Sequence, residues 1–149
     1  MIKLDPVYPR ILADRDNYRK WYLDEPVQVE LHNGHVLRIP KGYRFDAHSV
    51  PFLFRWIFPK KEGKDIYASM IHDFLIDIEM FLRYNRRFQD EVYTIMMHDS
   101  IYQTNKYRSF FMPLAVRLFG FLKFGIWGDY RGEPKLNTKV NIIVMNDTI

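Results

Sequence analysis

The segment at residues 26–43, PVQVELHNGHVLRIPKGY, is the feature that most constrains the fold. Apolar side chains alternate along its first half and return in its second half, and Asn33-Gly34 separates the two runs. An Asn-Gly pair between such runs is a strong β-hairpin signal, because both central positions of the tight turn need a positive φ. The segment therefore predicts two paired strands, with apolar residues Val27, Val29 and Leu31 in the first and Val36, Leu37 and Ile39 in the second.

The rest of the chain is predicted to be mostly helical. After the hairpin, the pattern favours a loop that enters a short helix, with Ser49 as a candidate N-cap and Pro51 in the first turn. From residue 65 the apolar residues follow helical spacing, and they are Ile66, Met70, Ile71, Phe74 and Leu75. A second helix is expected from about residue 85, and a third, very apolar one over residues 108–128.

The third predicted helix approaches the length of a membrane span. It carries Pro113, Arg117, Gly120 and Lys123, which favour a buried or interfacial helix over a spanning one. The C-terminal tail contains one further predicted strand at residues 140–145. The expected fold class is α+β, an N-terminal β-hairpin packed on a core of about three helices, in a single domain over residues 1–149.

Composition restricts the chemistry. The chain has no cysteine, which excludes disulfides, thiolate catalysis and cysteine-bound zinc, so any metal must be held by histidine and carboxylate side chains. The net charge of +4 combines 22 basic with 18 acidic residues, and no specific nucleic-acid motif is present. The first ten residues lack the apolar core of a signal peptide, so the chain is expected in the cytoplasm where it is made.

Two His-Asp pairs are the candidate functional residues, at His72-Asp73 and His98-Asp99. Neighbouring residues on a helix point about 100° apart, so neither pair can form a hydrogen-bonded dyad by itself. A histidine acts as a general base when a carboxylate from another element holds its second ring nitrogen. The partner for His72 is expected to be Asp90 if the first helix ends near residue 77. It is expected to be in the region of His98 and Asp99 if that helix continues to residue 84.

Four blocks occur in order between about residues 36 and 120: IPKGYRFDAHSVP, ASMIHDFLI, NRRFQDEVY and FFMPLAVRLFG. They resemble the patterns I-P-x-G-F-x-T-D-x-A-S-V-P, A-x-x-H-D-x-L-Y, R-x-x-x-D-x-x-F and A-V-R-x-F-G of a family of unknown function found mainly in phages and prophages. The resemblance implies a phage origin. The pattern falls on Gly42, Asp46, Ser49, Pro51, His72, Asp73, Leu75, Asp90 and Arg117.

The chain departs from that pattern at three positions, where Phe45, His48 and Ile76 replace threonine, alanine and tyrosine. His98 and Asp99 lie outside the blocks and are therefore ranked below His72 and Asp73.

The helix with His72 and Asp73, followed by Asp90, also resembles the active-site helices of secreted and bacterial phospholipases A2. That resemblance implies that His72 activates water, Asp73 binds calcium and Asp90 orients His72. The chain lacks the glycine-rich calcium loop and the cysteine framework of those enzymes. Asp46 could replace a missing oxygen ligand of a divalent cation.

Three other interpretations stay open. Ser49, His72 and Asp90 follow the order of a nucleophile, base and orienting group, although Ser49 is better explained as an N-cap. A second is the ligand set of a metal-dependent phosphohydrolase, formed by His48, His72, Asp73 and Asp99. The third is structural: the aspartates accept hydrogen bonds from nearby arginines, of which the candidates are Arg44, Arg86, Arg87 and Arg117.

The leading hypothesis is a phage-encoded hydrolase of ester, lipid or cell-envelope substrates. In it His72 is the base, Asp90 orients it, Asp73 and Asp46 hold a divalent cation such as Ca²⁺, and Ser49 and Arg87 are additional site candidates. The alternative is a non-enzymatic virion component of the tail or head, or an assembly protein. Expected partners are other phage proteins or an envelope or lipid surface, and the expected location is the host cytoplasm or, after assembly, the virion.

Overall fold

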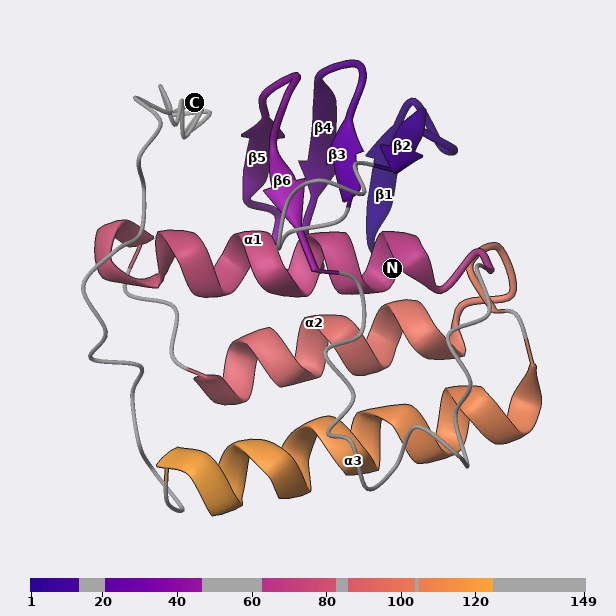
Figure 1. The fold of residues 1–149 in the computed structure, drawn as a ribbon, viewed down its shortest axis with the longest axis vertical. Coiled ribbons are helices and arrows are strands. Elements are labelled where there is room, and N and C mark those ends of the chain that lie inside the picture. The colour runs from indigo at the N-terminus through magenta and orange to yellow at the C-terminus, as the bar shows by residue number, and fades with distance from the viewer. Residues whose placement is uncertain (14–20, 47–62, 83–85, 104, 125–149) are drawn as a thin grey trace. The chain divides into compact units, whose positions relative to one another are not determined.

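The computed structural model describes residues 1–13, 21–46, 63–82, 86–103 and 105–124. The described strands lie in a compact unit that contains residues 1–46, and the described helices in a second unit formed by residues 47–134. The predicted α+β class with three helices is confirmed (Figure 1). The short helix predicted after Ser49 and the strand predicted at residues 140–145 fall outside the described residues, and the single domain stays a prediction.

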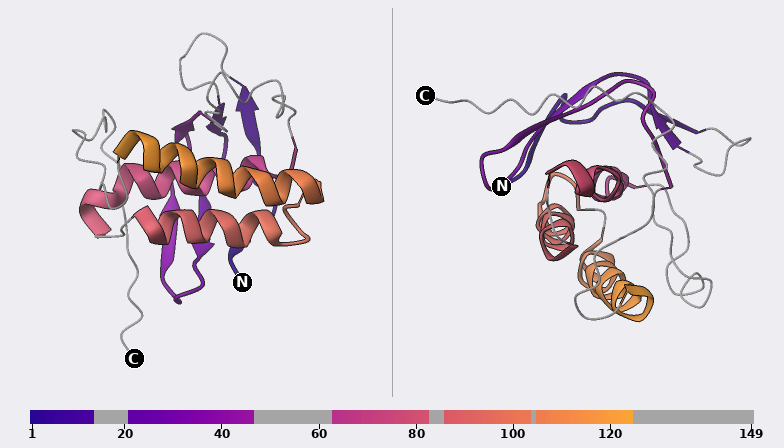
Figure 2. Two further views of the ribbon diagram at one scale, coloured as in Figure 1. Left: turned by 90° about the horizontal axis from the view of Figure 1, so that it is seen from below. Right: turned by 90° about the vertical axis from the view of Figure 1, so that its left-hand side faces the viewer.

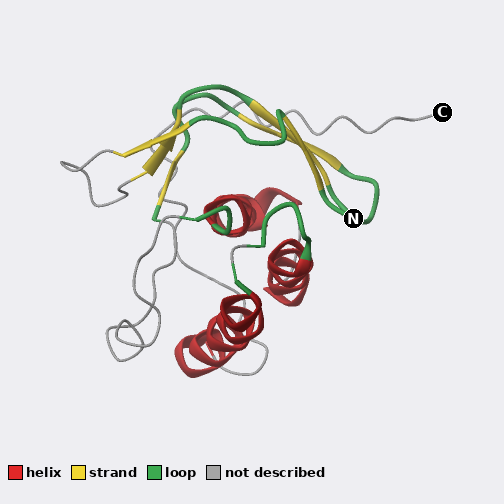
Figure 3. Cartoon of the chain, turned by 90° about the vertical axis from the view of Figure 1, so that its right-hand side faces the viewer, coloured by secondary structure: helices red, strands yellow, loops and turns green. Residues whose placement is uncertain are grey.

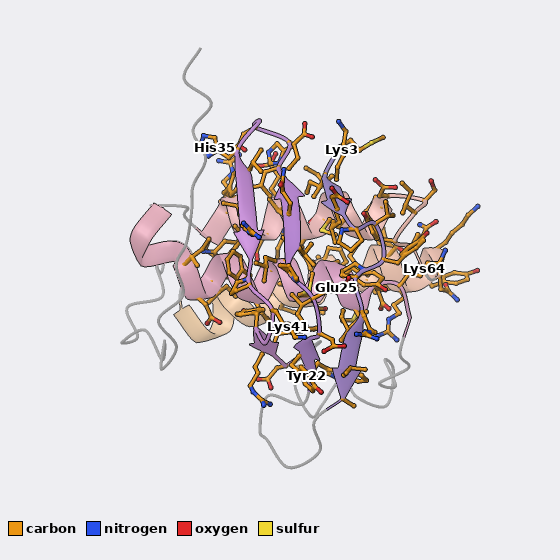
Figure 4. All side chains as sticks on the ribbon, turned by 90° about the horizontal axis from the view of Figure 1, so that it is seen from above. Lys3, Tyr22, Glu25, His35, Lys41 and Lys64 are labelled. Atoms are coloured by element: carbon orange, nitrogen blue, oxygen red, sulfur yellow. The ribbon has the colours of Figure 1, made fainter. Side chains whose placement is uncertain are left out.

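The N-terminal unit contains two antiparallel sheets of three strands each, in the orders β1-β4-β5 and β2-β3-β6. Lys3 and His35 lie at one end of this unit, and Tyr22 and Lys41 lie at the other (Figure 4). The strands are β1 (Lys3–Asp5), β2 (Ile11–Ala13), β3 (Trp21–Leu23), β4 (Val27–Glu30), β5 (Val36–Ile39) and β6 (Arg44–Phe45).

The predicted hairpin is strands β4 and β5, which pair with Glu30 opposite Val36. Its turn differs from the expected one. Gly34 N–H donates to the carbonyl of Leu31 at 3.0 Å, so His32 and Asn33 occupy the central turn positions, and Gly34 follows with φ at 83°. This is the three-residue loop in which a type I turn is completed by a left-handed glycine. The Asn33 side chain accepts from the His35 N–H and reinforces it.

Alternation explains which face of the β1-β4-β5 sheet is buried. Side chains of a strand point to opposite faces in turn, and every second residue here is apolar. The buried side chains are at most 3% exposed, while Lys3, Gln28, Glu30 and Arg38 between them are exposed. The buried set is Leu4, Val27, Val29, Leu37 and Ile39. Gly42, also at a φ of 83°, lets the chain turn from β5 toward β6.

The second unit contains α1 (Ile66–Leu82), α2 (Arg86–His98) and α3 (Lys106–Phe124), which lie side by side (Figures 2 and 3). Helix α2 packs against both α1 and α3. Four of the five apolar residues predicted for the first helix are buried, and they are Met70, Ile71, Phe74 and Leu75. From α2 the core receives Val92, Tyr93, Met96 and Met97.

Candidate functional site

His72 on α1 and Asp90 on α2 meet across the interface of these two helices. His72 Nε2 lies 3.1 Å from Asp90 Oδ1, and the two side chains are 13% and 10% exposed. A carboxylate can only accept, so Nε2 carries the proton in this contact and a neutral ring has its lone pair on Nδ1. Within the described part of the chain, Nδ1 has no hydrogen-bond partner. Among the described residues, the pair thus has the geometry of a histidine that a carboxylate orients through one ring nitrogen and that has no partner at the other.

The position of this contact along α2 differs from what the end of the first helix predicted. Helix α1 continues to Leu82, yet His72 still faces Asp90 rather than the end of α2. The reason is that α1 extends past the first turn of α2, as Figure 1 shows, so the two helices are offset along their length. A second contact agrees with the offset: Gln89 Nε2 donates to the Leu75 carbonyl at 3.4 Å.

Arg86 holds the other oxygen of Asp90. Its Nε lies 3.8 Å from Asp90 Oδ2, and its guanidinium donates to the Arg117 carbonyl on α3 at 3.2 Å. The guanidinium passes so close to Gly120 that a Cβ at that position would overlap it. A side chain at position 120 would therefore displace the Arg86 guanidinium, which connects the Asp90 carboxylate to α3.

Tyr93 covers the ring of His72 from the next turn of α2. The two ring centroids are 5.2 Å apart, and Tyr93 is 2% exposed. Burial raises the pKa of the Tyr93 phenol above its ordinary value, the Asp65 carboxylate raises it further, and a hydrogen bond with the Ser69 side chain opposes these effects. Tyr93 is consequently protonated at neutral pH and fixes one wall around the imidazole.

A buried ion pair connects the start of α1 with α3. Asp65, 1% exposed, pairs with Arg108 Nε. Each pair of helices is thus joined by a polar link, through His72 and Asp90, through Arg86 and Arg117, and through Asp65 and Arg108. Asp65, which directly precedes α1, and Arg108 on α3 hold these helices in one relative position, because separating them would leave the buried Asp65 carboxylate without this cation.

The other predicted site residues are placed as follows. Asp73 is partly buried on α1 and contributes to the raised pKa of Tyr93. Asp46 lies in the N-terminal unit, and Ser49 lies outside the described residues. Arg87 is exposed, and it is its neighbour Arg86 that contacts Asp90.

The second His-Asp pair ends a helix. His98 is the last residue of α2 and is exposed, and the Asp99 carboxylate accepts from the Ile101 N–H at 2.9 Å in a local turn. The Asp99 side chain thus serves a local turn at the end of α2.

Potential metal ligands do not cluster in the described ranges. Among these residues, no group of three or more histidine or acidic side chains is arranged to hold a metal ion. A calcium site takes six to eight oxygen ligands, and Asp73 supplies one carboxylate beside His72. The described residues therefore do not by themselves fit a calcium centre. No helix in these ranges is long and apolar enough to cross a membrane.

A family model described as "Protein of unknown function (DUF1353)" matches residues 21–116. The chain belongs to this family. The DUF1353 match includes His72, Asp90 and Tyr93 together with the ion pair of Asp65 and Arg108, whereas Gly120 lies beyond it. Searches of curated proteins and of solved structures found no match.

Two residues near the DUF1353 histidine, Tyr93 and Ser69, were not predicted from the sequence, and Arg86 was predicted only as a candidate donor to the aspartates. Arg86, Asp90 and Tyr93 are spaced i, i+4 and i+7, so they share one face of α2, and this spacing was a usable signal. Ser69 lies one turn before His72 on α1 and could have been found in the same way. The pairing of Asp65 with Arg108 had no local signal, because it depends on how α3 packs.

Proposed function

We propose that the chain is a phage-encoded hydrolase of ester, lipid or cell-envelope substrates, with His72 as general base and Asp90 as the group that orients it. The observation that carries the proposal is the 3.1 Å contact between His72 Nε2 and Asp90 Oδ1 across two helices. This arrangement leaves Nδ1 without a partner among the described residues, which is what a base requires.

The proposed reaction follows from that geometry. Nδ1 takes a proton from a water molecule as the water oxygen bonds to the substrate carbonyl carbon. The bond from that carbon to the leaving oxygen then breaks, and the leaving group receives the proton from the imidazolium. Asp90 stabilises the imidazolium and keeps the ring in place, and Arg86 limits the movement of Asp90.

A divalent cation is a separable part of the proposal and rests on Asp73, the carboxylate adjacent to His72. Calorimetric titration with CaCl₂ of the intact chain and of Asp73→Asn tests it. Weaker calcium binding in Asp73→Asn would support a ligand role, and equal or absent binding in both would remove calcium from the proposal.

Hydrolysis of p-nitrophenyl esters and of phosphatidylglycerol vesicles tests the base itself. We expect His72→Ala to lose about 100-fold or more of the rate, since general-base catalysis contributes roughly 10²–10⁴-fold. Asp90→Asn should lower kcat more than it raises KM, because the histidine loses its orientation. His98→Ala is the matched control on an exposed histidine and should retain the wild-type rate.

Added imidazole should restore part of the activity of His72→Ala, which a purely structural histidine would not allow. If the wild-type chain hydrolyses none of these substrates, or His72→Ala hydrolyses them at the wild-type rate, the hydrolase proposal fails. In that case, recovery of the chain in purified phage particles would support the alternative of a virion or assembly component.

A further inference from the structure

Helix α3 presents an apolar stripe to solvent. Its large apolar side chains recur at i, i+3, i+4, i+7 and i+11, so they fall on one face of the helix. The stripe consists of Tyr107, Phe110, Phe111, Leu114 and Leu118, which are between 45% and 77% exposed. Monomeric proteins rarely expose a continuous row of large apolar side chains, and such a surface usually marks an interaction site.

The opposite face of α3 packs within the helical unit. Ser109 and Met112 are buried, Arg108 pairs with Asp65, and the Arg117 carbonyl accepts from Arg86. The helix therefore cannot turn its stripe inward without breaking these contacts. A partner must meet α3 from the side, along its length of about 28 Å.

The charges of α3 favour an anionic partner. The helix contains Lys106, Arg108, Arg117 and Lys123 and no acidic residue. Lys106 and Arg117 are both exposed and lie about three helical turns apart, so both flank the same edge of the stripe. A row of aromatic and leucine side chains with cations along its edge is the arrangement of helices that lie in the interface of an anionic membrane.

We propose that α3 docks this stripe on the surface of an anionic lipid bilayer. The phenylalanines and leucines enter the region between headgroups and acyl chains, while Lys106 and Arg117 stay with the lipid phosphates. A second copy of the chain is less well matched, because two α3 helices would bring two rows of cations together. The proposal does not depend on the chemistry of His72.

Co-sedimentation of the intact chain with lipid vesicles tests the docking surface. We expect binding to phosphatidylcholine vesicles that contain phosphatidylglycerol, and much weaker binding to phosphatidylcholine alone. The triple variant Phe110→Ser, Phe111→Ser, Leu114→Ser should bind at least about tenfold more weakly, because partitioning scales with the buried apolar area. Leu12→Ser, an exposed leucine of β2, is the matched control and should bind like the wild type.

Charge variants give a second test that leaves the apolar stripe intact. Lys106→Gln and Arg117→Gln should each weaken binding to anionic vesicles about fivefold. Arg38→Gln, at an exposed cation of β5, should leave binding unchanged at about 0.15 M salt. His72→Ala should bind vesicles like the wild type, so that loss of hydrolysis and loss of docking are distinguishable.

The oligomeric state provides the opposing outcome. Sedimentation velocity should show a monomer for both the wild type and the triple variant. A wild-type dimer that the triple variant dissociates would assign the stripe to a second copy of the chain and overturn the membrane proposal. Absence of vesicle binding by the wild type, or equal binding by the triple variant, would overturn it as well.

Discussion

At the scale of single residues, Tyr93 gives the most direct test of the environment of His72. The pKa of its phenol is raised, first by burial and then by Asp65, above the value of about 10 that an unfolded chain would show. The folded state therefore retains a proton that the unfolded state loses. This contribution to stability is complete below about pH 10 and is lost progressively as the pH rises further.

We expect the Tyr93→Phe variant to lose less stability than the wild type between about pH 9.5 and 11.5, because it has no phenol at this position to ionise. Urea denaturation at a series of pH values measures the free energy of unfolding of both proteins. Tyr107→Phe, at a largely exposed tyrosine, should follow the wild-type curve. Parallel curves for Tyr93→Phe and the wild type would show that Tyr93 ionises as easily in the folded chain as in the unfolded one.

At the scale of elements, the ion pair of Asp65 and Arg108 controls how α3 is fixed to α1. Replacing Arg108 by methionine leaves a carboxylate that is 1% exposed without its cation, which should lower the free energy of unfolding by about 3–5 kcal/mol. The double variant Asp65→Asn, Arg108→Met should recover a large part of that loss, because no buried charge remains. Denaturant unfolding of the two single variants and the double variant measures the coupling, and additive effects would show that the pair is not coupled.

Local sequence patterns predicted an element well where the element had enough residues to show its period. The hairpin of β4 and β5, the apolar face of α1 and the position of α2 all followed from alternation or from helical spacing. Strands β1, β2, β3 and β6 have only two or three residues each, too few to establish a period of two. The three-residue turn was also missed, because whether Asn33 and Gly34 are both central depends on the register of the hairpin.

The candidate site was predictable in part for a related reason. His72 and Asp90 were paired as one of two options, and the offset between α1 and α2 decided between them. That offset is a property of packing, as is the passage of Arg86 over Gly120, and neither is encoded in a short window of residues. Tyr93 and Ser69 lie on the same helix faces as Asp90 and His72, so helical spacing alone was enough to place both near the histidine.

At the scale of the whole molecule, the net charge of +4 raises the question of whether vesicle binding would follow total charge or the cations of α3. Salt separates the two. Near 0.15 M the Debye length is about 8 Å, much shorter than α3, so charges far from the contact are screened, whereas near 0.01 M it is about 30 Å.

We therefore expect Arg117→Gln to weaken binding to anionic vesicles at both salt concentrations. Arg38→Gln should weaken binding only at the lower one. Co-sedimentation of both variants across this salt range measures the effect. If the two variants weaken binding equally near 0.15 M, attraction arises from the total charge of the chain and not from a surface built on α3.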